Sequence, residues 1–220
     1  MKSTLHSLAA VGLVAIAAVL TLAPAGRSAD DPAVAAVVDS LERGIPVLMA
    51  QAKIPGLSMA IVDRDGVVWA QGFGVREAGG VDPVTKETIF SAQSMSKVVT
   101  ATAIMLAVQD GVLDLDEPIA TYLPSFTVHS RFEDHPERSI TLRHLLSDGS
   151  GLDQETLAGG NYTVGPTTFE SHVRSISDTW TLYPVGTRYA YSNLGIDLAG
   201  YILQTVTGKP FAEYVDERLL

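Results

Sequence analysis

The sequence predicts an α+β fold in which an antiparallel sheet is flanked by helices. Apolar runs with helical spacing surround a single pair of β-rich runs, which favours this class. The 220-residue chain is 46% hydrophobic and 18% charged, a composition typical of a globular protein, and its length fits one domain with an inserted lobe. We expect that lobe, from about Asp110 to Asn193, to be mostly helical, and the sheet to be incomplete in this chain.

Three elements are predicted before the lobe. The stretch 31–56 should form a helix that ends at Pro55-Gly56, and its apolar face would consist of Val34, Val37, Val38, Leu41 and Val47. A hairpin should follow, because Arg64-Asp65-Gly66 separates two β-rich runs. The third element is a helix from about Ser94 to Gln109, which is almost wholly apolar and is therefore expected to be buried on all sides.

The first 25 residues have the features of a secretory signal peptide. Lys2 precedes a largely apolar stretch, Leu8 to Leu22, and the small-residue pattern Ala23-Pro24-Ala25 that signal peptidase cleaves follows it. The stretch is shorter than the roughly 20 residues that span a bilayer. We therefore expect export to the periplasm or the extracellular space, with membrane contact only through the signal segment if it stays uncleaved.

Charge and composition argue against several functions. The chain has 15 basic and 25 acidic residues, and its Lys and Arg residues form no stripe that could neutralise phosphates, so nucleic acid is not an expected partner. It has no cysteine, so covalent chemistry must use oxygen or nitrogen. We also expect no metal and no other cofactor, because metal-ligand spacing is lacking at His129, His135, His144 and His172.

Ser94 and Lys97 lie at the start of the apolar helix. Residues at i and i+3 share a helix face, so the hydroxyl and the amine should be neighbours. Burial disfavours the charged form of an amine, and a neutral amine can take the proton of a serine. The same pair also fits a helix-capping serine and a lysine that reaches solvent. The S-x-x-K pattern alone does not decide between these interpretations.

Tyr191 and Asn193 lie where a loop meets another predicted helix. Pro184 and Gly186 mark the loop, and the apolar pattern that follows ends at Gly208, a typical C-cap residue. Side chains at such a junction can point into a cleft. Asn193 could equally cap the helix, with Tyr191 packed beneath it.

Four blocks together resemble the serine β-lactamase-like hydrolases, which include class C β-lactamases, D-alanyl-D-alanine carboxypeptidases and related esterases. The blocks are Ser94-x-x-Lys97, DGVLDLDEPIATYLP (110–124), ITLRHLLSDGSGL (140–152) and Tyr191-x-Asn193. Their order and spacing match the family from about Ile54 to the last residue. The resemblance implies a β-lactamase/transpeptidase-like fold and a serine hydrolase that works through an acyl-enzyme.

The resemblance also implies roles for individual residues. Ser94 would be the nucleophile, and Lys97 would accept or orient its proton. Tyr191 would relay protons to the leaving group and help to activate the deacylating water. Asn193 would hydrogen-bond Lys97 and the substrate, which would be a small molecule or peptide with a β-lactam, D-alanyl-D-alanine or ester carbonyl.

Two departures from the family pattern stand out. Ser147-Asp148 resembles another family element, S-D-N, but the glycines after it continue a loop, so we do not place it in the site. The family usually has a histidine at the position of Asp148.

The second departure is a missing strand. The family completes its site with a strand bearing K-T-G or H-x-G, and no such triplet follows Asn193. We therefore expect residues 26–220 to be a β-lactamase-related serine hydrolase domain truncated at its C-terminus. Two alternatives stay open: a penicillin-recognising sensor or binding module that is acylated without turnover, and an inactive fragment.

Overall fold

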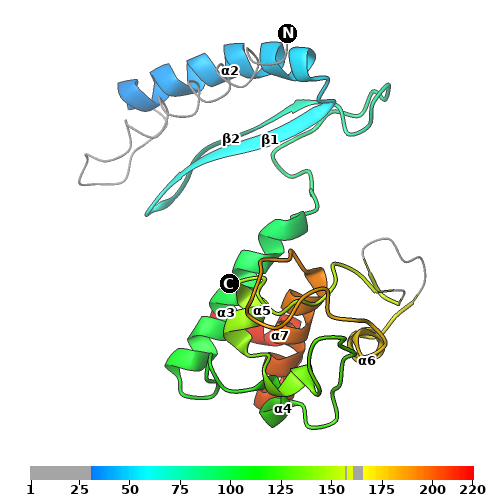
Figure 1. The fold of residues 1–220 in the computed structure, drawn as a ribbon. Helices are drawn as coiled ribbons and strands as arrows, with labels where there is room; N and C mark the ends of the chain where they lie inside the picture. The colour runs from blue at the N-terminus through cyan, green and yellow to red at the C-terminus, as the bar shows by residue number, and fades with distance from the viewer. Residues whose placement is uncertain (1–30, 157, 161–165) are drawn as a thin grey trace. The chain divides into compact units, whose positions relative to one another are not determined.

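The computed structural model describes residues 31–156, 158–160 and 166–220, and Figure 1 shows their helices and strands. The predicted signal peptide lies outside the described residues. The chain divides after Ser91 into two compact units, which we call unit 1 and unit 2. In the described ranges, no helix is long and apolar enough to cross a membrane.

Unit 1 contains helix α2, Pro32–Ala52. Asp31 caps it by accepting a hydrogen bond from the backbone N–H of Ala33, and Pro32 takes the first helical position, where no N–H is needed. The buried residues Val34, Ile45 and Met49 lie on one side of the helix. Val47, which we expected on that side, is 56% exposed, because it follows Ile45 by only two residues and so leaves the stripe.

The predicted hairpin is present in unit 1. Strand β1, Gly56–Asp63, pairs antiparallel with β2, Gly66–Gly74, and the two form a two-stranded sheet. The Asp63 carboxylate accepts a hydrogen bond of 2.8 Å from the Asp65 backbone across the turn, and Gly66 has a φ of 134° that favours glycine. The antiparallel sheet is therefore open, as the sequence predicted.

Unit 2 is built around two long helices, α3 (Ser96–Gln109) and α7 (Asn193–Thr207). Helix α8, Phe211–Arg218, packs against both of them. Irregular segments connect the remaining elements, which are the 3-10 turns η1 (Gln93–Met95) and η2 (Pro136–Arg138) and the short helices α4 (Ile119–Tyr122), α5 (Leu142–Leu146) and α6 (Phe169–Ile176).

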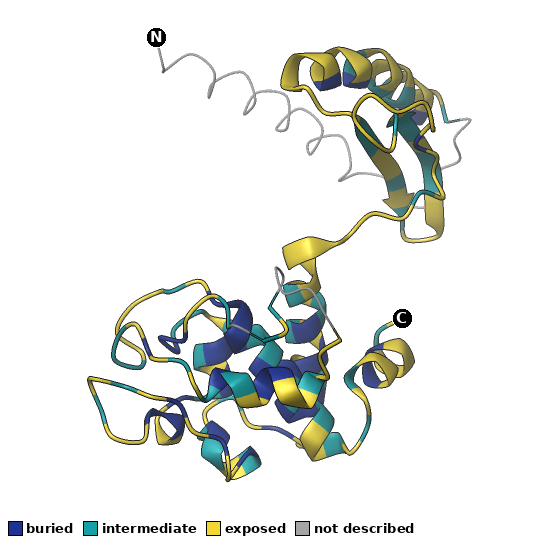
Figure 2. Ribbon diagram, turned by 90° about the vertical axis from the view of Figure 1, so that its right-hand side faces the viewer, coloured by how far each residue is buried: buried dark blue, intermediate teal, exposed yellow. Residues whose placement is uncertain are grey.

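The core of unit 2 lies between α3 and α7. Fully buried residues of α3 include Ala103, Ile104 and Ala107, and those of α7 include Leu198 and Ile202. The two alanines let the helix backbones approach closely. Burying each large aliphatic side chain contributes about 1.5–3 kcal/mol, so this contact is a main source of the unit's stability. Figure 2 shows the buried residues gathered among these helices.

Helix α3 differs from its prediction in two ways. The α-helix begins at Ser96, after the 3-10 turn η1, rather than at Ser94. The expected burial on all sides is wrong within the described structure, since Val98 and Met105 are 66% and 47% exposed. The core of unit 2 covers only the side that carries Ala103, Ile104 and Ala107.

Helix α7 begins and ends as predicted. Ser192 is its N-cap, and the Ser192 hydroxyl accepts a 2.9 Å hydrogen bond from the backbone N–H of Gly195. Gly208 ends the helix in the left-handed conformation, with a φ of 66°.

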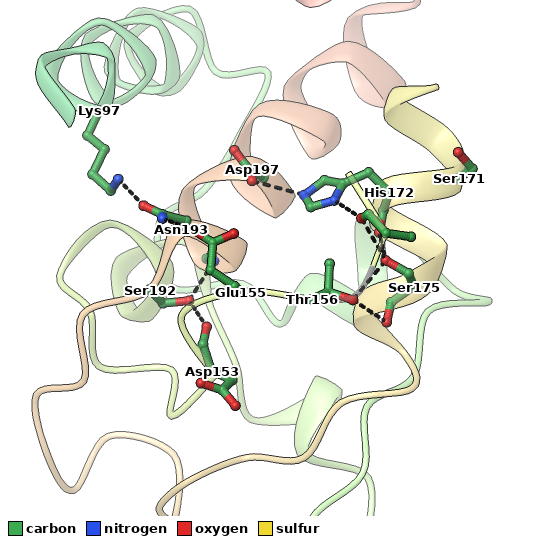
Figure 3. A network of polar contacts seen from close by, with 12 residues as sticks. Lys97, Asp153, Glu155, Thr156, Ser171, His172, Ser175, Ser192, Asn193 and Asp197 are labelled. Atoms are coloured by element: carbon green, nitrogen blue, oxygen red, sulfur yellow. Dashed lines mark hydrogen bonds and ion pairs between the residues drawn. The ribbon is translucent and has the colours of Figure 1, made fainter. Parts of the chain in front are cut away.

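His172 joins α6, α7 and the segment before α6 (Figure 3). Its Nδ1 lies 2.7 Å from the carbonyl oxygen of Ala158, and its Nε2 lies 2.9 Å from the carboxylate of Asp197 in α7. Both partners are acceptors, so both ring nitrogens donate only when the imidazole is protonated. The Asp197 hydrogen bond raises the pKa of His172 above its ordinary 6.5, although burial of the ring opposes this.

The His172 contacts predict a pH-dependent contribution to stability. A raised pKa means that the charged ring stabilises the folded state fully below pH 6.5, and that this stabilisation is lost as the pH rises through the raised value. We expect the loss of unfolding free energy in His172→Gln, measured by urea denaturation, to be larger at pH 6 than at pH 9.

Thr156→Val is the matched control, because it removes only neutral hydrogen bonds between the same segment and Ser175 in α6. Its loss of stability should be equal at the two pH values. An equal loss for His172→Gln at both values would contradict the charged state of this ring.

Candidate active site

The four residues singled out from the sequence lie together in unit 2. The Ser94 hydroxyl is 2.5 Å from the Tyr191 hydroxyl, and the Lys97 amine donates to Ser94 Oγ over 3.4 Å. Lys97 also donates to Asn193 Oδ1. The packing of α3 on α7 thus connects residues that are almost a hundred positions apart in the chain.

Ser94 lies in the 3-10 turn η1, just before α3. Met95 is the N-cap of α3 and no side chain caps this helix, so the hydroxyl of Ser94 is not used for capping. Gln93, immediately before Ser94, has a φ of 48°, a left-handed conformation that costs energy for a non-glycine residue and occurs often at functional sites. Ser94 is exposed, so its hydroxyl is accessible to a ligand.

Asn193 connects Lys97 to Glu155 (Figure 3). The Asn193 Nδ2 donates to Glu155 Oε1 at 2.5 Å, while its Oδ1 accepts from the Lys97 amine. An ammonium group only donates and a carboxylate only accepts, so these two partners determine the orientation of the amide. Asn193 does not cap α7, because Ser192 takes that position.

The phenol of Tyr191 is the group whose acidity the site changes. Hydrogen bonds from Lys97 and from Ser94 hold the pKa of Tyr191 below its usual 10.0, and the charge of Lys97 adds to this effect. The Lys97 amine also lies 4.7 Å from the centre of the Tyr191 ring. A phenol with a lowered pKa, in contact with a serine hydroxyl, is suited to exchange a proton with it.

Ser147, which belongs to the motif that resembles S-D-N, has a different role. Ser147 is the C-cap of α5, and its hydroxyl donates to the backbone carbonyl of Arg143. Each of the four histidines also has another partner: His129 stacks on Trp180, His135 contacts Glu137, His144 belongs to the capping box of α5 with Thr141, and His172 contacts Asp197.

Glu155 is a site residue that the sequence analysis missed. It lies three positions after Leu152, the last residue of the third block, and its segment has no regular spacing that would mark it. A side chain at Gly160 would meet Glu155 Oε2 at 2.6 Å, so the glycine leaves room for the carboxylate. Only the folded loop reveals this neighbour of Asn193.

We expect the Glu155 contact to stabilise unit 2. Asn193 is 9% exposed, so Glu155→Ala would leave a buried amide donor without this acceptor and should lower the unfolding free energy by about 1–3 kcal/mol. Glu155→Gln keeps an acceptor oxygen and should cost less. A double-mutant cycle with Asn193→Ala isolates the pair, and a coupling energy near zero would contradict it.

The Lys97 contact predicts a change in the titration of Tyr191. In Lys97→Met, the phenol loses both the hydrogen bond and the positive charge that lower its pKa, so it should titrate at higher pH. NMR of ¹³Cζ-labelled tyrosine, assigned with Tyr191→Phe, measures this midpoint. Lys209→Met is the control, because Lys209 pairs with Glu217 instead. A Tyr191 midpoint that is equal in Lys97→Met and in the wild type would argue against the contact.

Comparison with known proteins gives a consistent result. Residues 41–220 match the family model described as Beta-lactamase. Esterase EstB of Burkholderia gladioli is 29% identical over 210 residues, which cover 89% of this chain and 51% of the esterase.

Two solved structures are also similar to the chain. The octameric penicillin-binding protein homologue of Pyrococcus abyssi has a TM-score of 0.68 and 32% identity, over 83% of this chain and 42% of that one. D-amino acid amidase of Ochrobactrum anthropi SV3 has a TM-score of 0.69 and 25% identity, over 82% of this chain and 48% of that one. The chain therefore spans about half the length of these proteins.

The similarity covers the segments that carry Ser94, Lys97, Tyr191 and Asn193, all of which fall within the matched residues. The solved structures that are similar to the chain have the β-lactamase/transpeptidase fold. The chain belongs to the beta-lactamase family, within the serine β-lactamase-like hydrolases.

Proposed function

We propose that this protein is a serine hydrolase that cleaves an ester or amide through an acyl-enzyme, with Ser94 as the nucleophile. The observation that carries the proposal is the contact of the Ser94 hydroxyl with Tyr191 and Lys97, which can take its proton in their deprotonated forms, a phenolate and a neutral amine. A serine becomes a useful nucleophile only with such a base beside it.

In the acylation step, Ser94 Oγ bonds to the substrate carbonyl carbon as its proton moves to the Tyr191 phenolate, either directly or by way of the neutral Lys97 amine. The bond to the leaving group then breaks, and Tyr191 passes a proton to the departing alcohol or amine. The backbone N–H of Ser94 is available to a developing oxyanion, where a preorganised donor contributes several kcal/mol in the transition state. Water, activated by Tyr191, then hydrolyses the acyl ester and restores Ser94.

Asn193 and Lys97 act together in this scheme. Because Asn193 Oδ1 accepts from the Lys97 amine, it holds that amine against Ser94. The amide of Asn193 also provides a polar contact for the substrate beside the nucleophile. A small-molecule or peptide substrate is the partner we propose, without a metal or another cofactor.

The relatives support the proposed substrate class. One of them is named an esterase and another a D-amino acid amidase, so both C–O and C–N cleavage occur among similar proteins. The pattern of residues 1–25 supports export, which would bring the protein to cell-wall peptides, β-lactams or small esters.

Covalent capture of Ser94 is the first test. The protein would be incubated with a fluorophosphonate, and separately with a fluorescent penicillin, and weighed intact by mass spectrometry. We expect one fluorophosphonate adduct per molecule, absent in Ser94→Ala and retained in Ser147→Ala, the serine of the rejected motif. The absence of any adduct, or its persistence in Ser94→Ala, would overturn the assignment.

The penicillin and an ester substrate then separate the function classes. Hydrolysis of a nitrophenyl ester that is lost in Ser94→Ala would support an enzyme. A stable penicillin adduct on Ser94 without hydrolysis would instead support a sensor or binding module and contradict turnover.

A further inference from the structure

Asp148 holds the backbone on both sides of Tyr191. The backbone N–H of Ala190 donates to the carbonyl oxygen of Asp148 at 2.8 Å, and the N–H of Ser192 donates to Asp148 Oδ1 at 3.0 Å. One residue therefore provides the acceptors for both neighbours of the phenol.

The segment that contains Asp148 supports the Tyr191 loop along its length. Leu182 N–H donates to Gly151 O at 2.7 Å, Gly186 N–H to Gly149 O at 2.9 Å, and Asn193 N–H to Gln154 O at 3.2 Å. The Ser192 hydroxyl donates to Asp153 O at 2.7 Å. In the other contacts named here, the segment contributes backbone carbonyl oxygens. The Asp148 carboxylate is the side chain of the segment that takes part in these contacts.

The conformation of Asp148 allows both contacts. Its φ of 56° is left-handed, a region in which aspartate and asparagine occur more readily than other residues with a side chain. Asp148 is half-buried, so the carboxylate is partly shielded from water.

The charge of Asp148 also reaches the phenol. Lys97 and Ser94, on the side of α3, lower the pKa of Tyr191, whereas burial and the charge of Asp148 act to raise it. Burial, followed by the charge and a hydrogen bond of the same carboxylate, raises the pKa of Tyr189. The titratable groups that act on the pKa of Tyr191 are thus Lys97 from α3 and Asp148 from the loop after α5, and Tyr191 in turn acts to raise the pKa of Tyr189 in its own loop.

We infer that Asp148 is a positioning residue for Tyr191: it fixes the loop so that the phenol meets Ser94, and its negative charge opposes that of Lys97 at the phenol. The inference rests on the proposed function, in which Tyr191 moves protons.

Two substitutions separate the charge from the contact. Asp148→Asn keeps an Oδ1 acceptor for Ser192 and tolerates the left-handed backbone, but it removes the charge. The Tyr191 midpoint, measured by the ¹³Cζ titration, should fall, because the charge of Asp148 acts to raise it. Asp148→Gly also accepts the backbone conformation but removes the acceptor. The loop should then release the phenol from Lys97, and the midpoint should rise above that of the wild type.

Asp153→Asn is the matched control, since it removes a carboxylate from the same segment while its backbone contact to Ser192 remains. Its Tyr191 midpoint should equal the wild-type value. An unchanged midpoint in Asp148→Asn would overturn the role of the charge, and equal midpoints in Asp148→Gly and Asp148→Asn would overturn the role of the contact. If Asp148→Gly does not fold, hydrogen exchange of the Ser192 backbone amide tests the contact instead. Rapid exchange of this amide in both the wild type and Asp148→Asn would overturn the contact.

The titration does not depend on turnover. If Ser94 took up no fluorophosphonate while the Tyr191 midpoints moved as expected, the proposed function would fail and the contact between Asp148 and Tyr191 would stand. If Ser94 were labelled and the midpoints did not move, the function would stand and the inference about Asp148 would fail.

Discussion

The packing of α3 against α7 is the interaction on which the rest of unit 2 depends. Ala103 and Ala107 present small side chains to the larger residues of α7, so the helices can lie close together. The same contact places the first turn of α3 beside the start of α7, where Lys97 meets Asn193. Apolar burial, which has no directional preference, thus supplies the stability, and polar contacts at one end of the helix pair supply the geometry.

These polar contacts extend from the candidate site into the rest of the unit. Asn193 leads from Lys97 to Glu155, and the segment after Glu155 is held to α6 and α7 through His172. Each partner in this series is either a charged group or a group whose atoms act only as donors or only as acceptors. Few arrangements therefore satisfy all of these hydrogen bonds at once. The nucleophile is therefore supported by contacts from three helices and a loop, all within one unit.

Sequence reasoning predicted the parts of this arrangement that follow local rules. The hairpin turn at Arg64-Asp65 and the end of α7 at Gly208 depend on residues with strong backbone preferences, and both are present. Ser94, Lys97, Tyr191 and Asn193 were found through their resemblance to a family, and the structure brings them together. Glu155 was not predicted, because its role arises from a loop that folds back on Asn193. The exposure of Val98 was not predicted either, since composition cannot tell which side of an apolar helix a core will cover.

The extended backbone of Ser192, with φ −137° and ψ 120°, has a consequence for how this site can vary. In an extended stretch, successive side chains point to opposite sides, so Tyr191 and Asn193 face the nucleophile while Ser192 turns away to cap α7 and bind the carbonyl of Asp153. Inserting or deleting one residue here would exchange the reactive and the anchoring positions. Because of this alternation, the site depends on the number of residues between the loop and α7 as strictly as it depends on the identities of Tyr191 and Asn193.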